Sequence, residues 1–224
     1  MNLIDMLGRR LFPALVALAA AAGIAQAEPV PDFLVAKPDL GDPFFEQSVI
    51  LMLPPPAIPL IAGVIINKPT TLSVKQIFPK ASGLAAPSDM VYFGGPVEPD
   101  AVLMVRRTSA PIKNERHVFA DLYLTVDPND ISTLLQSKDL DRANLRLFRG
   151  YSQWGRDQLR AEKMEGSWDE VPANPELVFT SNPKQLWRQL SERARYLRVN
   201  APYEDLPEIL PCSFGFRLEP LDSR

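Results

Sequence analysis

The chain has 224 residues, of which 46% are hydrophobic and 23% are charged, values typical of a globular domain that can bury a core. Its formal net charge of −3 argues against a nucleic-acid-binding protein, because such proteins carry a basic surface. With one cysteine, Cys212, and one histidine, the chain can form no intrachain disulfide and offers no ligand set for a structural zinc ion.

The first 27 residues have the order of a bacterial export signal. Arg9 and Arg10 precede an apolar run over residues 11–24, and Ala25-Gln26-Ala27 matches a signal-peptidase site. We therefore expect residues 1–27 to be a signal peptide that is cleaved after Ala27, leaving a periplasmic or secreted protein with no stable membrane span. The general secretory and twin-arginine routes both stay open, as does an uncleaved anchor helix.

Apolar runs in the next part of the chain are short, as in strands. They predict strands at residues 33–36, 48–53, 60–67 and 90–93, and a helical turn at residues 72–78. Asp42-Pro43 pairs a capping residue with proline and so predicts a turn at residues 44–45. Because residues 48–53 and 60–67 are apolar on successive positions, both strands are expected to be covered on two faces.

Further strands are expected at residues 101–107, 117–126 and 145–149, and short extended segments at residues 168–171 and 177–180. In residues 117–126, alternate side chains from Val118 to Val126 should share one face. Helices are predicted to begin at Asp127-Pro128, to run over residues 154–165, and to begin at Asn182-Pro183.

Strands come in runs and outnumber helices, which indicates an α+β fold. We predict a single domain over residues 28–199, with a largely antiparallel β-sheet core and a few flanking helices. A proline-rich C-terminal extension, residues 200–224, follows it.

The stretch Gly150-Tyr151-Ser152-Gln153-Trp154-Gly155 resembles the turn that presents a serine nucleophile in many hydrolases. Trp154 stands where that turn needs a small residue. The only histidine, His117, precedes Ser152, whereas the hydrolase order places histidine last. We therefore predict no catalytic residue and interpret Ser152 as part of a strand-to-helix turn; a His–Asp–Ser or Ser–Lys arrangement is left as an alternative.

Other candidate sites are weaker. Residues 127–130 resemble the start of a calcium loop but are interpreted as a helix cap, and Gly94-Gly95 is interpreted as a turn with positive φ. The carboxylates of Glu98 and Asp100 flank a proline with no evident role. Four basic residues near a hairpin form either an anion-binding patch or a solvated edge strand: Arg106, Arg107, Lys113 and Arg116. We predict neither a metal nor a cofactor.

Five motifs occur in series: FLVAKPDLGDPFFEQSVILM, GVIINKPT, VYFGGPV, GYSQWGRDQLRAE and GSWDEVPANPELVF. Together they resemble the YqgE/AlgH family of bacterial proteins, over residues 33–197. The resemblance implies one α+β domain with an antiparallel sheet, no established enzymatic activity and no cofactor; part of the family's name comes from a proposed regulatory role in alginate production. The positions that carry it are Asp42, Pro43, Asn67, Pro69, Gly94, Gly95, Pro96, Gly150, Tyr151, Trp154, Gly155, Gln158, Leu159 and Trp168.

The chain departs from the family pattern in its export signal, in the segment PPPAIP and in its proline-rich extension. We interpret it as an exported, non-enzymatic binding or regulatory domain with an unknown protein or small-molecule partner; nothing indicates its oligomeric state. The expected binding surface is a groove beside residues 94–97 and 150–158, with the site residues Asn67, Gly94, Gly95, Tyr151, Ser152 and Gln158. Two alternatives remain: a hydrolase-like enzyme that uses this groove, and an envelope scaffold that works through residues 200–224.

Overall fold

The computed structural model describes residues 32–55, 60–81 and 89–200. The expected signal peptide lies outside these ranges, as does all of the expected extension except Asn200. The described strands are β1 (Asp32–Ala36), β2 (Val49–Met52), β3 (Leu60–Ile65), β4 (Pro69–Ser73), β5 (Met90–Phe93), β6 (Val97–Arg107), β7 (Arg116–Phe119), β8 (Leu122–Thr125), β9 (Leu145–Gly155) and β10 (Trp168–Pro172). The described helices are α1 (Val74–Ile77), α2 (Pro128–Gln136), α3 (Arg156–Met164), α4 (Pro175–Val178) and α5 (Pro183–Asn200).

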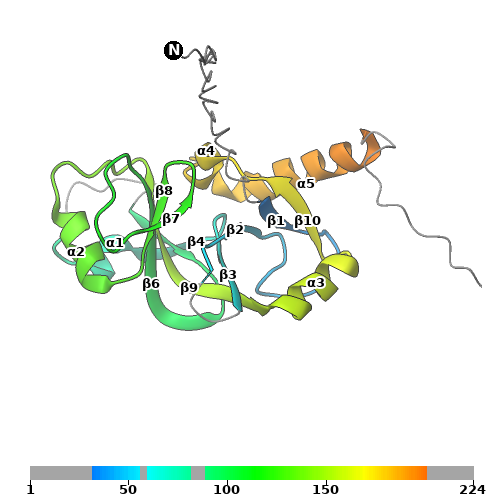
Figure 1. Ribbon diagram of the computed structural model, residues 1–224, viewed down its shortest axis with the longest axis horizontal. Coiled ribbons are helices and arrows are strands. Elements are labelled where there is room, and N and C mark those ends of the chain that lie inside the picture. The colour runs from blue at the N-terminus through cyan, green and yellow to red at the C-terminus, as the bar shows by residue number, and fades with distance from the viewer. Residues whose placement is uncertain (1–31, 56–59, 82–88, 201–224) are drawn as a thin grey trace, which may run out of the picture.

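The strands form one curled sheet in the order β10-β1-β2-β3-β9-β6-β8-β7, with β4 and β5 branching from β9. Every strand pair is antiparallel except β5 with β9. Figure 1 shows α1 and α2 at one end of the molecule and α3 with α5 at the other. The predicted α+β fold with a largely antiparallel sheet is therefore confirmed.

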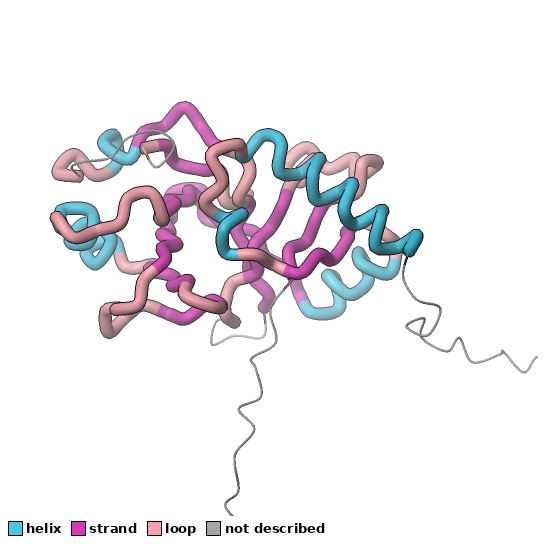
Figure 2. The backbone as a smooth tube through the Cα atoms, turned by 90° about the horizontal axis from the view of Figure 1, so that it is seen from above, coloured by secondary structure: helices cyan, strands magenta, loops and turns pink. Residues whose placement is uncertain are grey.

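Helices cover the sheet where its strands bury both faces. In β2, Val49 and Leu51 join a core cluster that includes Leu186 and Leu190 of α5, whereas Ile50 points to the opposite cluster beside Trp154. Figure 2 shows α5 lying across the strands at that end of the molecule. This double covering explains why β2 is apolar on successive residues, as expected. None of the described helices is long and apolar enough to cross a membrane.

Two predictions in the second half of the chain are wrong. Residues 117–126 form the hairpin β7–β8 rather than one strand, and the turn places Ala120 at a φ of 48°. No glycine or proline marks this turn, so the sequence does not signal it. Residues 177–180 are not extended, because Asn174 caps α4 by accepting a hydrogen bond from the Glu176 amide at 2.9 Å.

The expected strand-to-helix turn at Ser152 is also absent. Strand β9 continues to Gly155, and α3 begins only at Arg156. The continuation is stabilised by β3, which pairs with residues 152–155 of β9. A partner strand about ninety residues away in sequence therefore decides this segment's structure, which local propensity cannot reveal.

Candidate functional site

The paired glycine motifs mark the place where the chain crosses over its own strand. Strand β5 lies along one edge of β9 and β6 lies along the other, so the segment between them must pass over β9. A Cβ atom on Gly95 would collide with the Tyr151 backbone, and one on Gly150 would collide with the Gly95 carbonyl oxygen. Gly150 also has a φ of 68°. The glycines thus permit a backbone-on-backbone crossing.

Ser152 is fully buried at this crossing. Its hydroxyl donates a hydrogen bond to the Gly94 carbonyl oxygen at 3.1 Å. His117 lies on β7, and because β8 and β6 separate β7 from β9 in the sheet, about 14 Å divides these two strands. Neither a nucleophile turn nor a histidine base is therefore present at Ser152, and the expected turn residue is instead a strand residue that fixes the crossing.

Asn67 is 6% exposed and holds the start of β2. Its Oδ1 accepts from the Val49 amide at 2.8 Å, and its Nδ2 donates to the Gln47 carbonyl oxygen at 2.8 Å. Gln47 adopts a φ of 51°, a strained conformation that these two bonds secure. In the described structure, the polar atoms of Asn67 are thus engaged by backbone groups.

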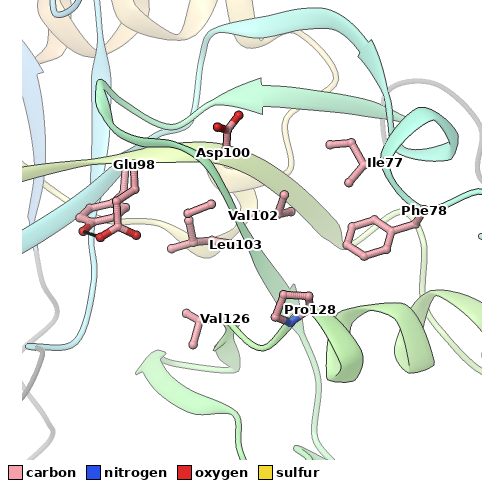
Figure 3. A pocket seen from close by; sticks show the side chains of 10 residues that line it. Ile77, Phe78, Glu98, Asp100, Val102, Leu103, Val126 and Pro128 are labelled. Carbon is pink, nitrogen blue, oxygen red and sulfur yellow. Dashed lines mark hydrogen bonds between the residues drawn. The ribbon is translucent and has the colours of Figure 1, made fainter.

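Tyr151 faces a concave surface that we call the central groove, which has a volume of about 520 Å³. Its lining is mostly apolar and includes Phe78, Val102, Leu103 and Val126. Figure 3 shows Glu98 at one end, Ile77 with Phe78 at the other, and Asp100 between them along one side. Leu103, Val126 and Tyr151 also line an adjoining hollow of about 180 Å³, so the two volumes form one trough. Volumes of this size suit a small ligand or a few side chains of a partner.

A bulge in β6 builds the acidic end of the central groove. Val97 pairs with Tyr151 and Val102 pairs with Arg149, so five steps along β6 match two along β9. The residues between leave the ladder, and Glu98 takes a φ of 44°. Bulges of this kind re-aim side chains and recur beside binding sites. The sequence alone gave Glu98 and Asp100 no role, because the bulge depends on the pairing with β9.

Hydrogen bonds hold this acidic end in place. The Tyr151 hydroxyl donates to Glu98 Oε1 at 3.0 Å, and Arg149 donates to Asp100 Oδ1 at 2.6 Å. Partial burial, and then the hydrogen bond to the Glu98 carboxylate and its charge, raise the pKa of Tyr151 above its usual value. The hydroxyl therefore remains a donor at neutral pH and leaves the negative charge on Glu98.

Gln158 lies at a second concave surface, the tryptophan groove, of about 290 Å³. Pro96, Val97 and Gln153 also line it, so it includes part of the two segments 94–97 and 150–158. Its other walls include Asp42, Phe45, Trp154, Glu162 and Trp168. The expected site residues therefore do not form one surface: Gln158 belongs to the tryptophan groove, Tyr151 to the central groove, and the other four are buried.

Three of the four basic residues that left an anion-binding patch or a solvated edge strand as alternatives are arginines with partners within the molecule. Arg106 pairs with Glu115 at 2.6 Å, and Arg107 pairs with Asp121 at 3.0 Å and with Glu176 at 2.8 Å. Arg116 donates to the carbonyl oxygens of Pro54 and Pro55 and so supports one wall of the adjoining hollow.

The cap interpretation of residues 127–130 agrees with the structure. Asp127 accepts from the amides of Asn129, at 2.7 Å, and Asp130. Across the described ranges, no cluster of three histidine, cysteine, aspartate or glutamate residues is arranged to hold a metal ion.

The chain is similar to several bacterial proteins over most of its length. It is 34% identical over 158 residues to a UPF0301 protein of Cytophaga hutchinsonii, which covers 70% of this chain and 85% of that protein. It is 36% identical over 184 residues to a UPF0301 protein of Streptomyces avermitilis, a match that covers 79% of this chain and 92% of that protein. The names of these relatives state no activity.

Two solved structures resemble the fold. A crystal structure of a Corynebacterium diphtheriae protein matches with a TM-score of 0.58 and 25% identity, over 74% of this chain and 87% of that one. The solution structure of AlgH from Pseudomonas aeruginosa matches with a TM-score of 0.58 and 22% identity, over 77% of this chain and 93% of that one. A family model described as AlgH-like matches residues 33–196. The chain therefore belongs to the AlgH-like family.

Proposed function

We propose that this protein is an exported, non-enzymatic binding domain of the bacterial cell envelope, and that the central groove is its docking site. The groove would take an apolar segment of a partner protein that carries a basic residue at one end. The single observation that carries this proposal is the combination of an apolar trough of about 520 Å³ with an acidic end held by Tyr151 and Arg149.

The apolar part of the groove supports a macromolecular partner. Val126 is 48% exposed although it is a large hydrophobic residue, and it belongs to both parts of the trough. Covering such a surface removes apolar area from water, at a gain of roughly 25 cal/mol per Å². Concentrated exposed apolar area on a soluble protein is a common mark of an interaction site.

The acidic end supports a preference for a basic residue in the partner. Glu98 is exposed and accepts a hydrogen bond from Tyr151, and Asp100 lies two residues further along the same bulge. Complementary charge contributes mainly to partner choice and to the rate of association. A catalytic role has less support, because Ser152 is buried and Tyr151 and Gln158 lie in different grooves.

Site-specific photo-crosslinking in intact cells tests the docking site. A benzophenone amino acid replaces Val126 in one strain and the exposed Gln189 of α5, outside the groove, in another. We expect a discrete adduct from position 126 and none from position 189. The adduct should weaken in a Glu98→Lys background. It should persist in a Glu165→Lys background, where the same charge change lies at the C-cap that follows α3. Equal adducts from both positions, or none from position 126, would contradict the proposal.

Export has a separate test, because it concerns residues 1–27, whereas the docking proposal is argued from residues that the structure describes. Cell fractionation followed by N-terminal sequencing should find the protein in the envelope fraction, with a mature N-terminus near Glu28. A chain that begins at Met1 in the cytosolic fraction would refute export and leave the docking proposal standing.

A further inference from the structure

We propose that the tryptophan groove is a second binding site, separate from the central groove, and that it takes an organic ammonium cation. The carboxylate of Glu162 would provide the opposite charge, and Phe45, Trp154 and Trp168 would form the aromatic wall. The ligand would be either a small free ammonium compound or the side chain of a lysine.

Three aromatic rings gather at this groove from segments far apart in the chain. The ring centres of Phe45 and Trp154 lie 5.7 Å apart, those of Phe45 and Trp168 lie 5.8 Å apart, and those of the two tryptophans lie 6.0 Å apart. Tryptophan is the side chain that attracts cations most strongly through its π electrons. Trp154 and Trp168 border the hollow of about 290 Å³ while 2% and 5% exposed, and Phe45 is the half-buried ring beside them.

The carboxylate of Glu162 is held in one position by neutral donors. Its Oε2 accepts from the indole N–H of Trp154 at 3.0 Å and from that of Trp168 at 2.9 Å. Its Oε1 accepts from the Gln158 amide at 2.9 Å. These bonds fix the carboxylate without cancelling its charge, as in sites that are organised before the ligand arrives.

Charge distinguishes this groove from an ordinary aromatic cluster. Within the part of the chain that the structure describes, Glu162 forms no ion pair. The other carboxylate of the groove, Asp42, caps a turn by accepting from the Phe44 amide at 2.7 Å, and Lys68 interacts with it electrostatically. Glu162 thus lies in the groove without an ion-pair partner among the described residues, and a cation is the ligand that would pair with it.

Nuclear magnetic resonance of the three indole N–H groups tests the proposal without a mutation. Trp154 and Trp168 line the groove, whereas Trp187 donates its indole N–H to the Ala36 carbonyl oxygen elsewhere. We expect tetramethylammonium, or Nα-acetyl-lysine methylamide, to shift the Trp154 and Trp168 signals in a saturable way and to leave Trp187 unchanged. Tighter binding of tetramethylammonium would indicate a free small molecule, and tighter binding of the lysine derivative a partner's side chain.

Two variants and a neutral probe complete the test. Glu162→Gln keeps the shape and should weaken cation binding about tenfold, whereas Glu165→Gln, at the C-cap that follows α3 and outside the groove, should not change it. Neutral tert-butanol should bind more weakly than either cation. The site is refuted if neither cation gives saturable shifts, if tert-butanol binds as well, or if Glu162→Gln binds cations unchanged. The central groove contains no tryptophan among its lining residues, so these outcomes leave the docking proposal untouched.

Discussion

At the crossing of the chain over β9, Gly95 and Gly150 stand where a Cβ atom has no room. Ser152 adds the hydrogen bond to Gly94 that ties the two segments together. The motif that resembles a nucleophile turn in the sequence therefore has an architectural task, and the likeness comes from a shared need for glycine next to a tight backbone approach.

Gly150→Ala should lower the free energy of unfolding by about 3 kcal/mol, because the new Cβ meets the Gly95 carbonyl oxygen at a positive φ. Gly41→Ala is the matched control, since nothing lies within 4 Å of the added Cβ. Urea titrations of both variants measure the difference. Equal stabilities would mean that the two backbones do not cross as closely as described.

The environment of Glu115 predicts that the stability of the protein depends on pH. Burial raises the pKa of this carboxyl, but hydrogen bonds from Arg106, the Ile112 amide and Thr125 outweigh it and lower the pKa below the usual 4.5. A carboxyl with a lowered folded-state pKa stabilises the protein above its unfolded pKa, and that stability is lost as the pH falls through the folded value.

Glu115→Gln should therefore destabilise the protein at pH 7 by roughly 3–5 kcal/mol, because it leaves Arg106 buried without its partner charge. The difference in stability between Glu115→Gln and the wild type should become smaller as the pH falls from 4.5 toward 2. Thermal melts of both proteins across this range check the prediction. A gap that stays constant with pH would show that the ion pair does not carry the effect.

Among the elements, the hairpin β7–β8 depends on an unusual turn residue. Ala120 has a φ of 48°, which costs a residue with a Cβ about 1–2 kcal/mol. Ala120→Gly should remove this strain and stabilise the protein by about 0.5–1 kcal/mol, whereas Ala161→Gly, in the exposed part of α3, should destabilise it by a similar amount. Chemical denaturation of both variants measures whether each change raises or lowers the free energy of unfolding. A loss of stability in both variants would contradict the positive φ of Ala120 in the turn of the hairpin.

Helix starts could be predicted from the sequence because their signals are local. Asp127 before Pro128 and Asn182 before Pro183 each mark the start of a helix that the structure contains. The hairpin could not be predicted because its turn carries neither glycine nor proline. The long β9 could not be predicted because it depends on β3, which pairs with it from a distant part of the chain. A strand residue contacts whichever partner the whole fold brings to it.

The expected site residues do not gather around one groove. Once β9 is a continuous strand, successive side chains point to opposite faces, so Tyr151 reaches the central groove while Trp154 lines the tryptophan groove. A turn at Ser152 would have let both contribute to one surface. The single wrong element therefore explains why one groove was expected where the structure has two.

Across the whole molecule, the three core clusters involve residues between Phe33 and Ala194. A chain that ends at Asn200 should therefore keep its melting temperature to within about 2 °C, equivalent to less than roughly 1 kcal/mol. Differential scanning calorimetry measures this. The same truncated protein should keep the crosslink from position 126; loss of the crosslink with an unchanged melting temperature would favour a scaffold that works through the extension.

The position of β9 in the sheet also sets an order of events during synthesis. This strand covers the edges of β3, β5 and β6, all of which leave the ribosome before it. A nascent chain that stops short of residue 155 thus exposes strand edges and apolar faces that only the missing segment can cover. We therefore expect the native sheet to form after most of the chain has been made, and incomplete chains to need protection from aggregation until then.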